Sequence, residues 1–179
     1  WGAVGTNGTC TPSTTVTATK TNLTVNSASE YQWSATLSLV PNTQYCYRIY
    51  LSSTDLLGTD PSPRFWTQLP AGSTQPFSFA VFGDWGAVDT SGANSEQANL
   101  MQRIAGSGAR FAITTGDNSY PSGSQNNYGD LTAVGGDLSA VFGPSFWAVP
   151  GSSIALFPTI GNHGLARSDT IHPHFQNWP

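Results

Sequence analysis

Three short runs of the sequence place a side chain that can bind a metal ion directly after an apolar stretch and a glycine. The runs are residues 83–86 (GDWG), 116–120 (GDNSY) and 161–164 (GNHG). Their donor side chains are Asp84, Asp117, Tyr120, Asn162 and His163. Carboxylate, amide and phenol oxygens suit hard metal ions, and two neighbouring carboxylates repel each other unless a proton or a cation lies between them. The runs together predict a metal site.

The elements that must position these side chains are three buried strands. We expect them at residues 77–82, 110–115 and 155–160, and residues 79–82 are apolar on both faces as in a covered parallel sheet. Residues 95–105 carry apolar side chains at helical spacing, and a Gly-Ser-Gly run follows them. A strand, helix, strand crossover makes the flanking strands parallel, so the first two runs should emerge at one sheet edge. A weaker helical pattern covers residues 131–142.

The first third of the chain has a different sequence pattern, in which β-branched and aromatic residues recur at every second position. We expect short strands here, at residues 15–19, 31–37, 44–51 and 64–67. This spacing is typical of an antiparallel sandwich. Residues 70–76 have linker composition, so we predict a β-sandwich over 1–69, a linker over 70–76 and an α/β domain over 77–179.

Composition excludes some partners. Charged residues make up only 9% of the chain, the formal net charge is -4 and the isoelectric point is about 5.0. A chain of this kind does not attract nucleic acid electrostatically. No apolar run has the length of about 20 residues that a membrane span needs. We therefore expect neither a nucleic acid nor a membrane as partner.

Cys10 and Cys46 are the two cysteines of the chain. They form either a disulfide or a pair of buried thiols; an even count in a Thr- and Ser-rich chain with one lysine favours the disulfide. A disulfide in turn predicts an oxidising compartment and a secreted, extracellular protein. Asn7 and Asn22 begin Asn-X-Thr triplets and are candidate glycosylation sites.

The three runs resemble the first three signature blocks of the calcineurin-like metallophosphoesterases, and Tyr120, three residues after Asp117, is typical of the purple acid phosphatases. The resemblance implies that Asp84 and Tyr120 bind Fe(III) and that Asp117 bridges two metals. It implies that Asn162 binds a divalent ion, which is Zn, Mn or Fe. It also implies that His163 contacts the substrate phosphate and assists the leaving group.

By the same resemblance the N-terminal sandwich is fibronectin-III-like, and the activity is hydrolysis of phosphate monoesters, with a small phosphate ester as substrate. Two features depart from the family. Gly164 stands where the family usually has an acidic residue, and the later blocks with the remaining histidine ligands are absent. We therefore expect an internal piece of a longer protein, inactive alone, whose metal site is completed by the remaining C-terminal part of the same protein.

Other interpretations stay open. His172 and His174 could supply imidazoles, but their position in a predicted loop favours a surface or packing role. The chain could also be a secreted binding or structural module with a degenerate phosphoesterase domain. A phosphodiesterase or nucleotidase of the same superfamily is a third reading.

Overall fold

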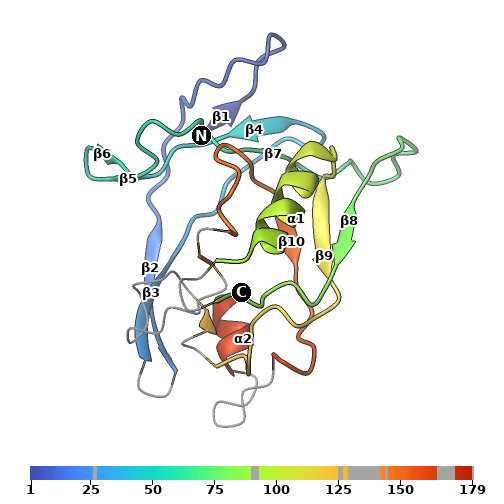
Figure 1. The fold of residues 1–179 in the computed structure, drawn as a ribbon. Helices are drawn as coiled ribbons and strands as arrows, with labels where there is room; N and C mark the ends of the chain where they lie inside the picture. The colour runs from blue at the N-terminus through green and yellow to red at the C-terminus, as the bar shows by residue number, and fades with distance from the viewer. Residues whose placement is uncertain are drawn as a thin grey trace.

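The described residues of the C-terminal half form a parallel sheet with a covering helix. The computed structural model, shown in Figure 1, describes residues 1–25, 28–89, 93–124, 127–128, 142–143, 145–164 and 172–178. Three strands, β8 (Ala80–Phe82), β9 (Phe111–Thr114) and β10 (Ala155–Phe157), lie in the order β10-β9-β8 and are all parallel. The three expected strands are confirmed, each shorter than the apolar run that predicts it. Their expected burial on both faces is wrong, since Val81 is 56% exposed and Phe157 is 53% exposed. The helical pattern over 131–142 lies outside the described residues except at its last position.

Helix α1 (Ser95–Gly106) connects β8 to β9, as the sequence predicts. It begins where the Asn94 side chain accepts the N–H groups of Glu96 and Gln97, which have no partner inside the helix. Its apolar side packs with β8 in the main core cluster. The members of this cluster are Phe82, Trp85, Leu100, Met101, Tyr128, Phe142, Phe146 and Trp178. The second helix, α2 (His172–Asn177), lies at the end of the chain.

The N-terminal part consists of small antiparallel sheets. Strands β1 (Gly2–Ala3), β4 (Gln44–Cys46) and β7 (Arg64–Trp66) form one sheet in the order β1-β4-β7. Two ribbons accompany it, β2 (Thr19–Val25) with β3 (Ala28–Ser34) and β5 (Tyr50–Leu51) with β6 (Thr54–Asp55). The β-rich, antiparallel character is confirmed, and the fibronectin-III-like assignment stays a prediction.

The strand expected at residues 15–19 is wrong except for its last residue. Trp1 holds the two residues before this segment, since its carbonyl accepts the Ser13 and Thr14 N–H groups and its amino group donates to the Thr14 carbonyl at 2.6 Å. Residues 15–18 have a high strand propensity, but they pair with no strand in the described part of the chain. The strand expected at 31–37 forms three residues earlier, because it pairs with β2 from Val25↔Ala28 to Thr19↔Ser34.

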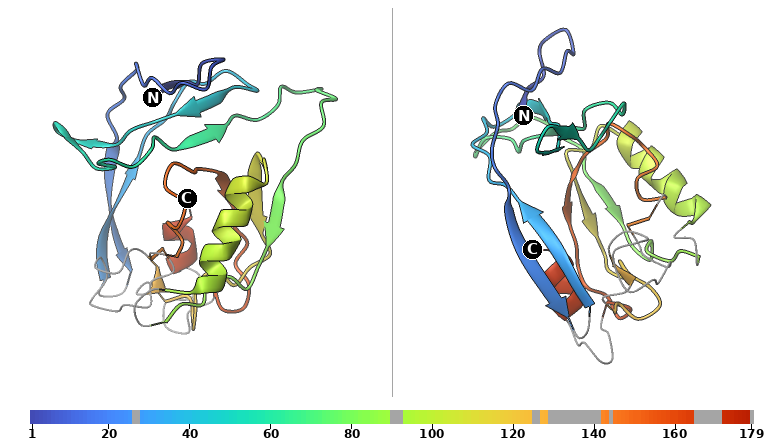
Figure 2. Two further views of the ribbon diagram at one scale, coloured as in Figure 1. Left: turned by 45° about the horizontal axis from the view of Figure 1, so that its top comes forward. Right: turned by 90° about the vertical axis from the view of Figure 1, so that its left-hand side faces the viewer.

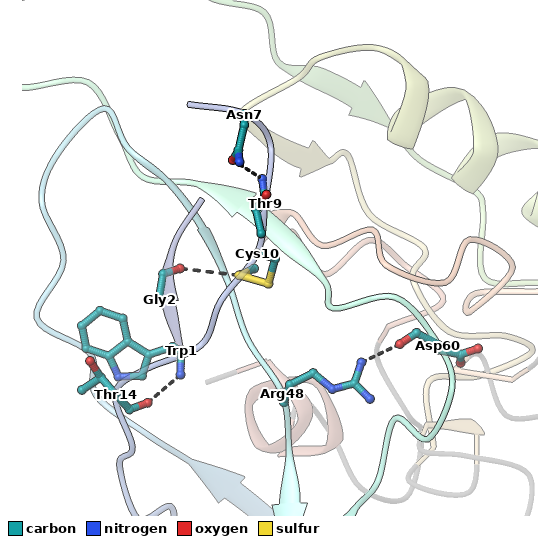
Figure 3. The surroundings of a disulfide bond; sticks show 9 residues. Trp1, Gly2, Asn7, Thr9, Cys10, Thr14, Arg48 and Asp60 are labelled. Atoms are coloured by element: carbon teal, nitrogen blue, oxygen red, sulfur yellow. Dashed lines mark hydrogen bonds between the residues drawn. A yellow bond between two sulfur atoms is a disulfide. The ribbon is translucent and has the colours of Figure 1, made fainter. Parts of the chain in front are cut away.

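Figure 3 shows the disulfide that joins Cys10 to Cys46, with a Cα–Cα distance of 6.0 Å. Cys46 is fully buried in β4 and pairs with Gly2 of β1, so the bridge fastens the N-terminal segment to the sheet. The disulfide prediction is confirmed, and secretion stays a prediction. Asn7, on the same loop, is exposed and accepts the Thr9 N–H at 2.9 Å; Asn22 on β2 is exposed as well.

The β1-β4-β7 sheet lies across the end of the parallel sheet at which β8 and β9 begin (Figure 2). The Arg110 guanidinium, one residue before β9, donates to the Thr67 carbonyl at 2.9 Å. Arg64 of β7 forms an isolated bridge with Ser152, and its N–H donates to the Gly151 carbonyl at 3.2 Å. The carboxyl ends of the parallel strands, where the three donor runs emerge, are left at the opposite edge.

Candidate metal centre

The three donor runs lie next to one another at the carboxyl edge of the parallel sheet. The ladder of hydrogen bonds continues past the strands: the Asp84 N–H donates to the Gly116 carbonyl, and the Asp117 N–H donates to the Ile160 carbonyl, both at 3.3 Å. Parallel strands place their carboxyl ends together, and these bonds hold the runs in register. The predicted meeting of the three runs is therefore present in the structure.

The glycine before each donor residue lies where one run touches the next. A Cβ on Gly83 would overlap the Thr115 hydroxyl, and a Cβ on Gly116 would lie 2.7 Å from the Gly161 Cα. A Cβ on Gly161 would overlap the amide nitrogen and Oδ1 of Asp117. Only a residue without a side chain lets the backbones approach this closely. The glycines of the motif thus have a packing reason: they bring the donor side chains within reach of each other.

Asp84, Asp117 and Tyr120 converge on one point. The Tyr120 hydroxyl lies 3.1 Å from Asp84 Oδ1 and 3.3 Å from Asp117 Oδ2. A phenol carries one proton, so at any instant it satisfies one of the two carboxylates fully. Asp117 is 8% exposed and also accepts the His163 N–H at 2.8 Å, whereas Asp84 is exposed. The arrangement concentrates negative charge that a bound cation would neutralise.

Both aspartates adopt a backbone conformation that L-residues rarely use. Asp84 has φ 52° and Asp117 has φ 53°, in the left-handed region. Aspartate tolerates this region better than most residues, but the conformation still costs about 1 kcal/mol for each. Strain of this kind gathers at functional sites, where the surrounding structure imposes it. Here it turns both carboxylates off the ends of β8 and β9 toward Tyr120.

The charges around Tyr120 also act on its ionisation. Burial raises the pKa of Tyr120, and the hydrogen bond with Asp84 and the negative charges of Asp117 and Asp84 raise it further, to about 12. The phenol is therefore neutral at physiological pH in the metal-free protein. A phenolate at this position needs a cation close to the oxygen.

His163 packs against Tyr120 beside the two carboxylates. The two rings are stacked with centroids 4.4 Å apart. The His163 Nδ1–H donates to the Pro121 carbonyl at 2.8 Å, because a carbonyl can only accept. This contact fixes the ring and assigns the proton to Nδ1. Nε2 then remains for a ligand.

Asn162 lies between residues that contact Asp117, but its exposed side chain makes no contact with Asp84, Asp117 or Tyr120 among the contacts described.

Gly164 is buried, and a Cβ there would overlap the Ile160 carbonyl. The acidic residue that the resemblance implies therefore has no room in this conformation.

His174 lies in helix α2, so the loop predicted for it is wrong. Its side chain is 5% exposed, and burial lowers its pKa. The predicted packing role of His174 agrees with this burial.

Asn118 is the positioning residue whose role the sequence indicates least. Its side chain is fully buried, accepts the Trp85 Nε1–H at 2.7 Å and donates to the Thr159 carbonyl. It therefore ties the run after β8 to the segment after β10, through the run after β9. Trp85 is a core residue, 4% exposed, rather than a pocket-lining one. The signal for this role in the sequence was that Asn118 follows Asp117 directly. The partners of the Asn118 side chain lie far away along the chain, so the sequence does not reveal them.

The donor set agrees in kind with a hard metal ion. Two carboxylates and a phenol oxygen within hydrogen-bond reach are hard ligands, and Asn162 lies on the neighbouring run. Within the described ranges, no three His, Cys, Asp or Glu side chains form a group that could hold a metal. The site therefore relies on Tyr120 as its third donor.

Comparisons with known proteins place no further constraint on the chain. Searches with protein-family models, curated proteins and solved structures found no match. Neither helix in the described part of the chain has the length and apolar composition that crossing a membrane requires. The functional argument therefore depends on the geometry of the three runs.

Proposed function

We propose that this chain contributes donors to a binuclear metal centre that hydrolyses phosphate monoesters, as in the purple acid phosphatases that its runs resemble. The observation that carries the proposal is the Tyr120 hydroxyl between two carboxylates, 3.1 Å from Asp84 Oδ1 and 3.3 Å from Asp117 Oδ2. Gly-Asp turns after strands are common, but a phenol placed between two of them is a specific arrangement. It favours a hard, highly charged cation.

In this proposal Asp84 and Tyr120 would hold Fe(III), Asp117 would be a ligand shared by both metals, and Asn162 would hold a divalent Zn, Mn or Fe ion. The metal ions supply Lewis acidity and lower the pKa of water, which allows hydrolysis without a strong protein base. The small phosphate ester is the partner whose chemistry suits the site.

The residues of the chain have separate tasks. The Pro121 carbonyl fixes the His163 ring at 2.8 Å, so Nε2 is free to hold a proton for a phosphate oxygen or for the leaving group. The His163 N–H, 2.8 Å from Asp117 Oδ1, fixes that carboxylate while its other oxygen faces Tyr120. One run thus orients both a donor carboxylate and a proton carrier.

The finer fold assignments belong to the same proposal. The antiparallel strands support a fibronectin-III-like domain over residues 1–69, and the β8-α1-β9 crossover supports the N-terminal half of a phosphoesterase domain over 77–179. The disulfide supports secretion.

The first test is Fe(III) binding. The purified chain is titrated with Fe(III), and the visible absorption and the bound iron are measured. We expect an absorption band from the Tyr120 phenolate, which Tyr120→Phe removes. Tyr50→Phe is the matched control, since Tyr50 is 59% exposed on β5. A band that survives Tyr120→Phe contradicts the proposal.

The second test is hydrolysis of an aryl phosphate with iron and zinc or manganese supplied. We expect at most trace turnover by this chain, because it carries only part of the ligand set. Any such turnover should be lost in Asp117→Asn. Turnover at the rate of a complete enzyme would show that the ligand assignment is wrong. Turnover that Asp117→Asn leaves unchanged would show that the site lies elsewhere.

A second candidate is a secreted binding module with a degenerate phosphoesterase domain. The observation that favours it is Gly164, where Ile160 leaves no space for the acidic side chain of the family. This module predicts no bound metal and no hydrolysis. Retention of stoichiometric iron after dialysis would exclude it.

A further inference from the structure

A pocket lies at the end of the parallel sheet opposite to the candidate metal centre. Its volume is about 320 Å³. Residues of β4, β7 and the end of α1 line it, together with the segments before β9 and β10. Its polar lining side chains are Gln44, Arg64, Arg110, Ser152 and Ser153. Because Arg110 precedes β9 and Asp117 follows it, the pocket and the metal centre are separate sites.

The pocket is electropositive although the chain as a whole is acidic. Two of the six Lys and Arg side chains line it, and none of its lining residues is Asp or Glu. In the part of the chain that the structure describes, the ion pair found is Arg48 with Asp55, which involves neither pocket arginine. The net charge of the whole chain is -4. A local pair of unneutralised guanidinium groups in such a chain attracts an anion.

Arg110 is held in a fixed position. Its guanidinium donates to the Thr67 carbonyl at 2.9 Å and to the Asn42 side chain, and lies 4.8 Å from the centroid of the Trp66 ring. A guanidinium has five N–H donors, so three remain after these two hydrogen bonds. The ordering entropy of this side chain is already lost before a ligand arrives, which favours binding.

Arg64 supplies the second positive charge from the same strand as Trp66. The two residues are two positions apart on β7, so their side chains leave the same face of the sheet. Arg64 is exposed, and its guanidinium makes none of the hydrogen bonds found among the described residues. None of its five donors is engaged by a described residue, so they can pair with an oxyanion.

We propose that this pocket binds a small organic anion. Its carboxylate or phosphate group pairs with Arg64 and Arg110, and its apolar body lies against Trp66 and Ile104. Arginine pairs with both oxyanions through parallel N–H donors, and a volume of about 320 Å³ is at the lower end of the range for small-molecule sites. This inference is independent of the proposed hydrolysis.

The experiment is calorimetric titration of the purified chain, with a chelator present so that no metal contributes. The probes are benzoate, phenylphosphonate and the neutral benzyl alcohol. We expect at least one anion to bind, with an affinity that falls as sodium chloride is raised, and benzyl alcohol to bind at least tenfold more weakly. The anion that binds more tightly identifies the head group as carboxylate or phosphate.

The test variant is Arg64→Gln, which removes the charge from an exposed side chain that has no hydrogen-bond partner among the described residues. We expect the affinity for the preferred anion to fall at least tenfold, about 1.4 kcal/mol. Arg103→Gln is the matched control, because Arg103 is an exposed arginine on α1 outside the pocket lining, and it should keep full affinity. Equal affinity of Arg64→Gln and the unmodified chain overturns the proposal. The proposal is also overturned if neither benzoate nor phenylphosphonate binds at a concentration of 10 mM. It is overturned as well if benzyl alcohol binds with the same affinity as the two anions.

Discussion

Replacing Gly161 by alanine tests whether the glycines of the three runs exist to bring the donor residues together. Gly161 has φ +67°, and a Cβ on it would overlap the amide nitrogen and Oδ1 of Asp117 and lie 3.0 Å from its Cγ. Asp117 cannot move away freely, since its N–H donates to the Ile160 carbonyl and its Oδ1 accepts the His163 N–H. The added methyl group must therefore break one of these bonds or shift a neighbouring run.

The expected free-energy change has two parts. An alanine in the left-handed region costs about 1–2 kcal/mol, and overpacking of a tight contact costs about 1–3 kcal/mol. Gly161→Ala should therefore lower the free energy of unfolding by about 2–5 kcal/mol. The total stability of a domain is about 5–15 kcal/mol, so this change is large enough to measure.

Gly108→Ala separates the two parts. Gly108 has φ +70°, nearly the same as Gly161, but a Cβ there would meet nothing within 4 Å. It should cost only the conformational term of about 1–2 kcal/mol. Both variants are unfolded in urea and followed by circular dichroism. If the two variants lose the same stability within 0.5 kcal/mol, the contact between Gly161 and Asp117 is not as tight as the argument requires.

Three further predictions concern other parts of the structure. Replacing both Cys10 and Cys46 by serine should lower the free energy of unfolding by about 4 kcal/mol, because the bridge closes a loop with a sequence separation of 36; an unchanged urea midpoint would contradict this. Burial raises the pKa of Tyr128 to about 12, whereas an unfolded tyrosine ionises near pH 10. As the pH rises, Tyr128 therefore loses its proton first in the unfolded state, and the free energy of unfolding falls between pH 10 and 12. Over that range the urea midpoint should fall less in Tyr128→Phe than in the unmodified chain. Phe79 and Val81 are about half exposed on the sheet face opposite α1, so the chain should bind a hydrophobic fluorescent dye. The double variant Phe79→Ser with Val81→Thr should reduce the fluorescence of the bound dye and leave the free energy of unfolding unchanged.

The sequence predicted the parallel sheet well because its signals are local. An apolar run that ends in Gly-Asp, followed by an amphipathic helix of suitable length and a second such run, leaves little choice of topology. The same local reasoning was wrong at residues 15–18, where strand propensity was high but the Trp1 carbonyl holds the neighbouring Ser13 and Thr14. Strand formation there depended on a partner that no local pattern could reveal.

The contacts that make the runs into a site were also beyond local reasoning. The donor residues could be named, since their types and positions after strands are visible in the sequence. The Tyr120 hydroxyl lies between Asp84 and Asp117, which are 33 positions apart in the sequence. This arrangement depends on how the loops that carry the two aspartates approach each other. The Asn118 contacts with Trp85 and with Thr159 depend on all three runs at once.

Helix α1 gives a physical reason why acidic and basic groups lie at opposite ends of one sheet. It runs antiparallel to β8 and β9, so its first turn lies near the run after β8, where Gln97 donates to the Trp85 carbonyl. Its last turn, with Ile104 and Ala105, lines the pocket that contains Arg64 and Arg110. A helix carries partial positive charge at its beginning and partial negative charge at its end. The carboxylates of the metal centre and the arginines of the pocket thus lie toward the helix ends whose partial charges are opposite to their own.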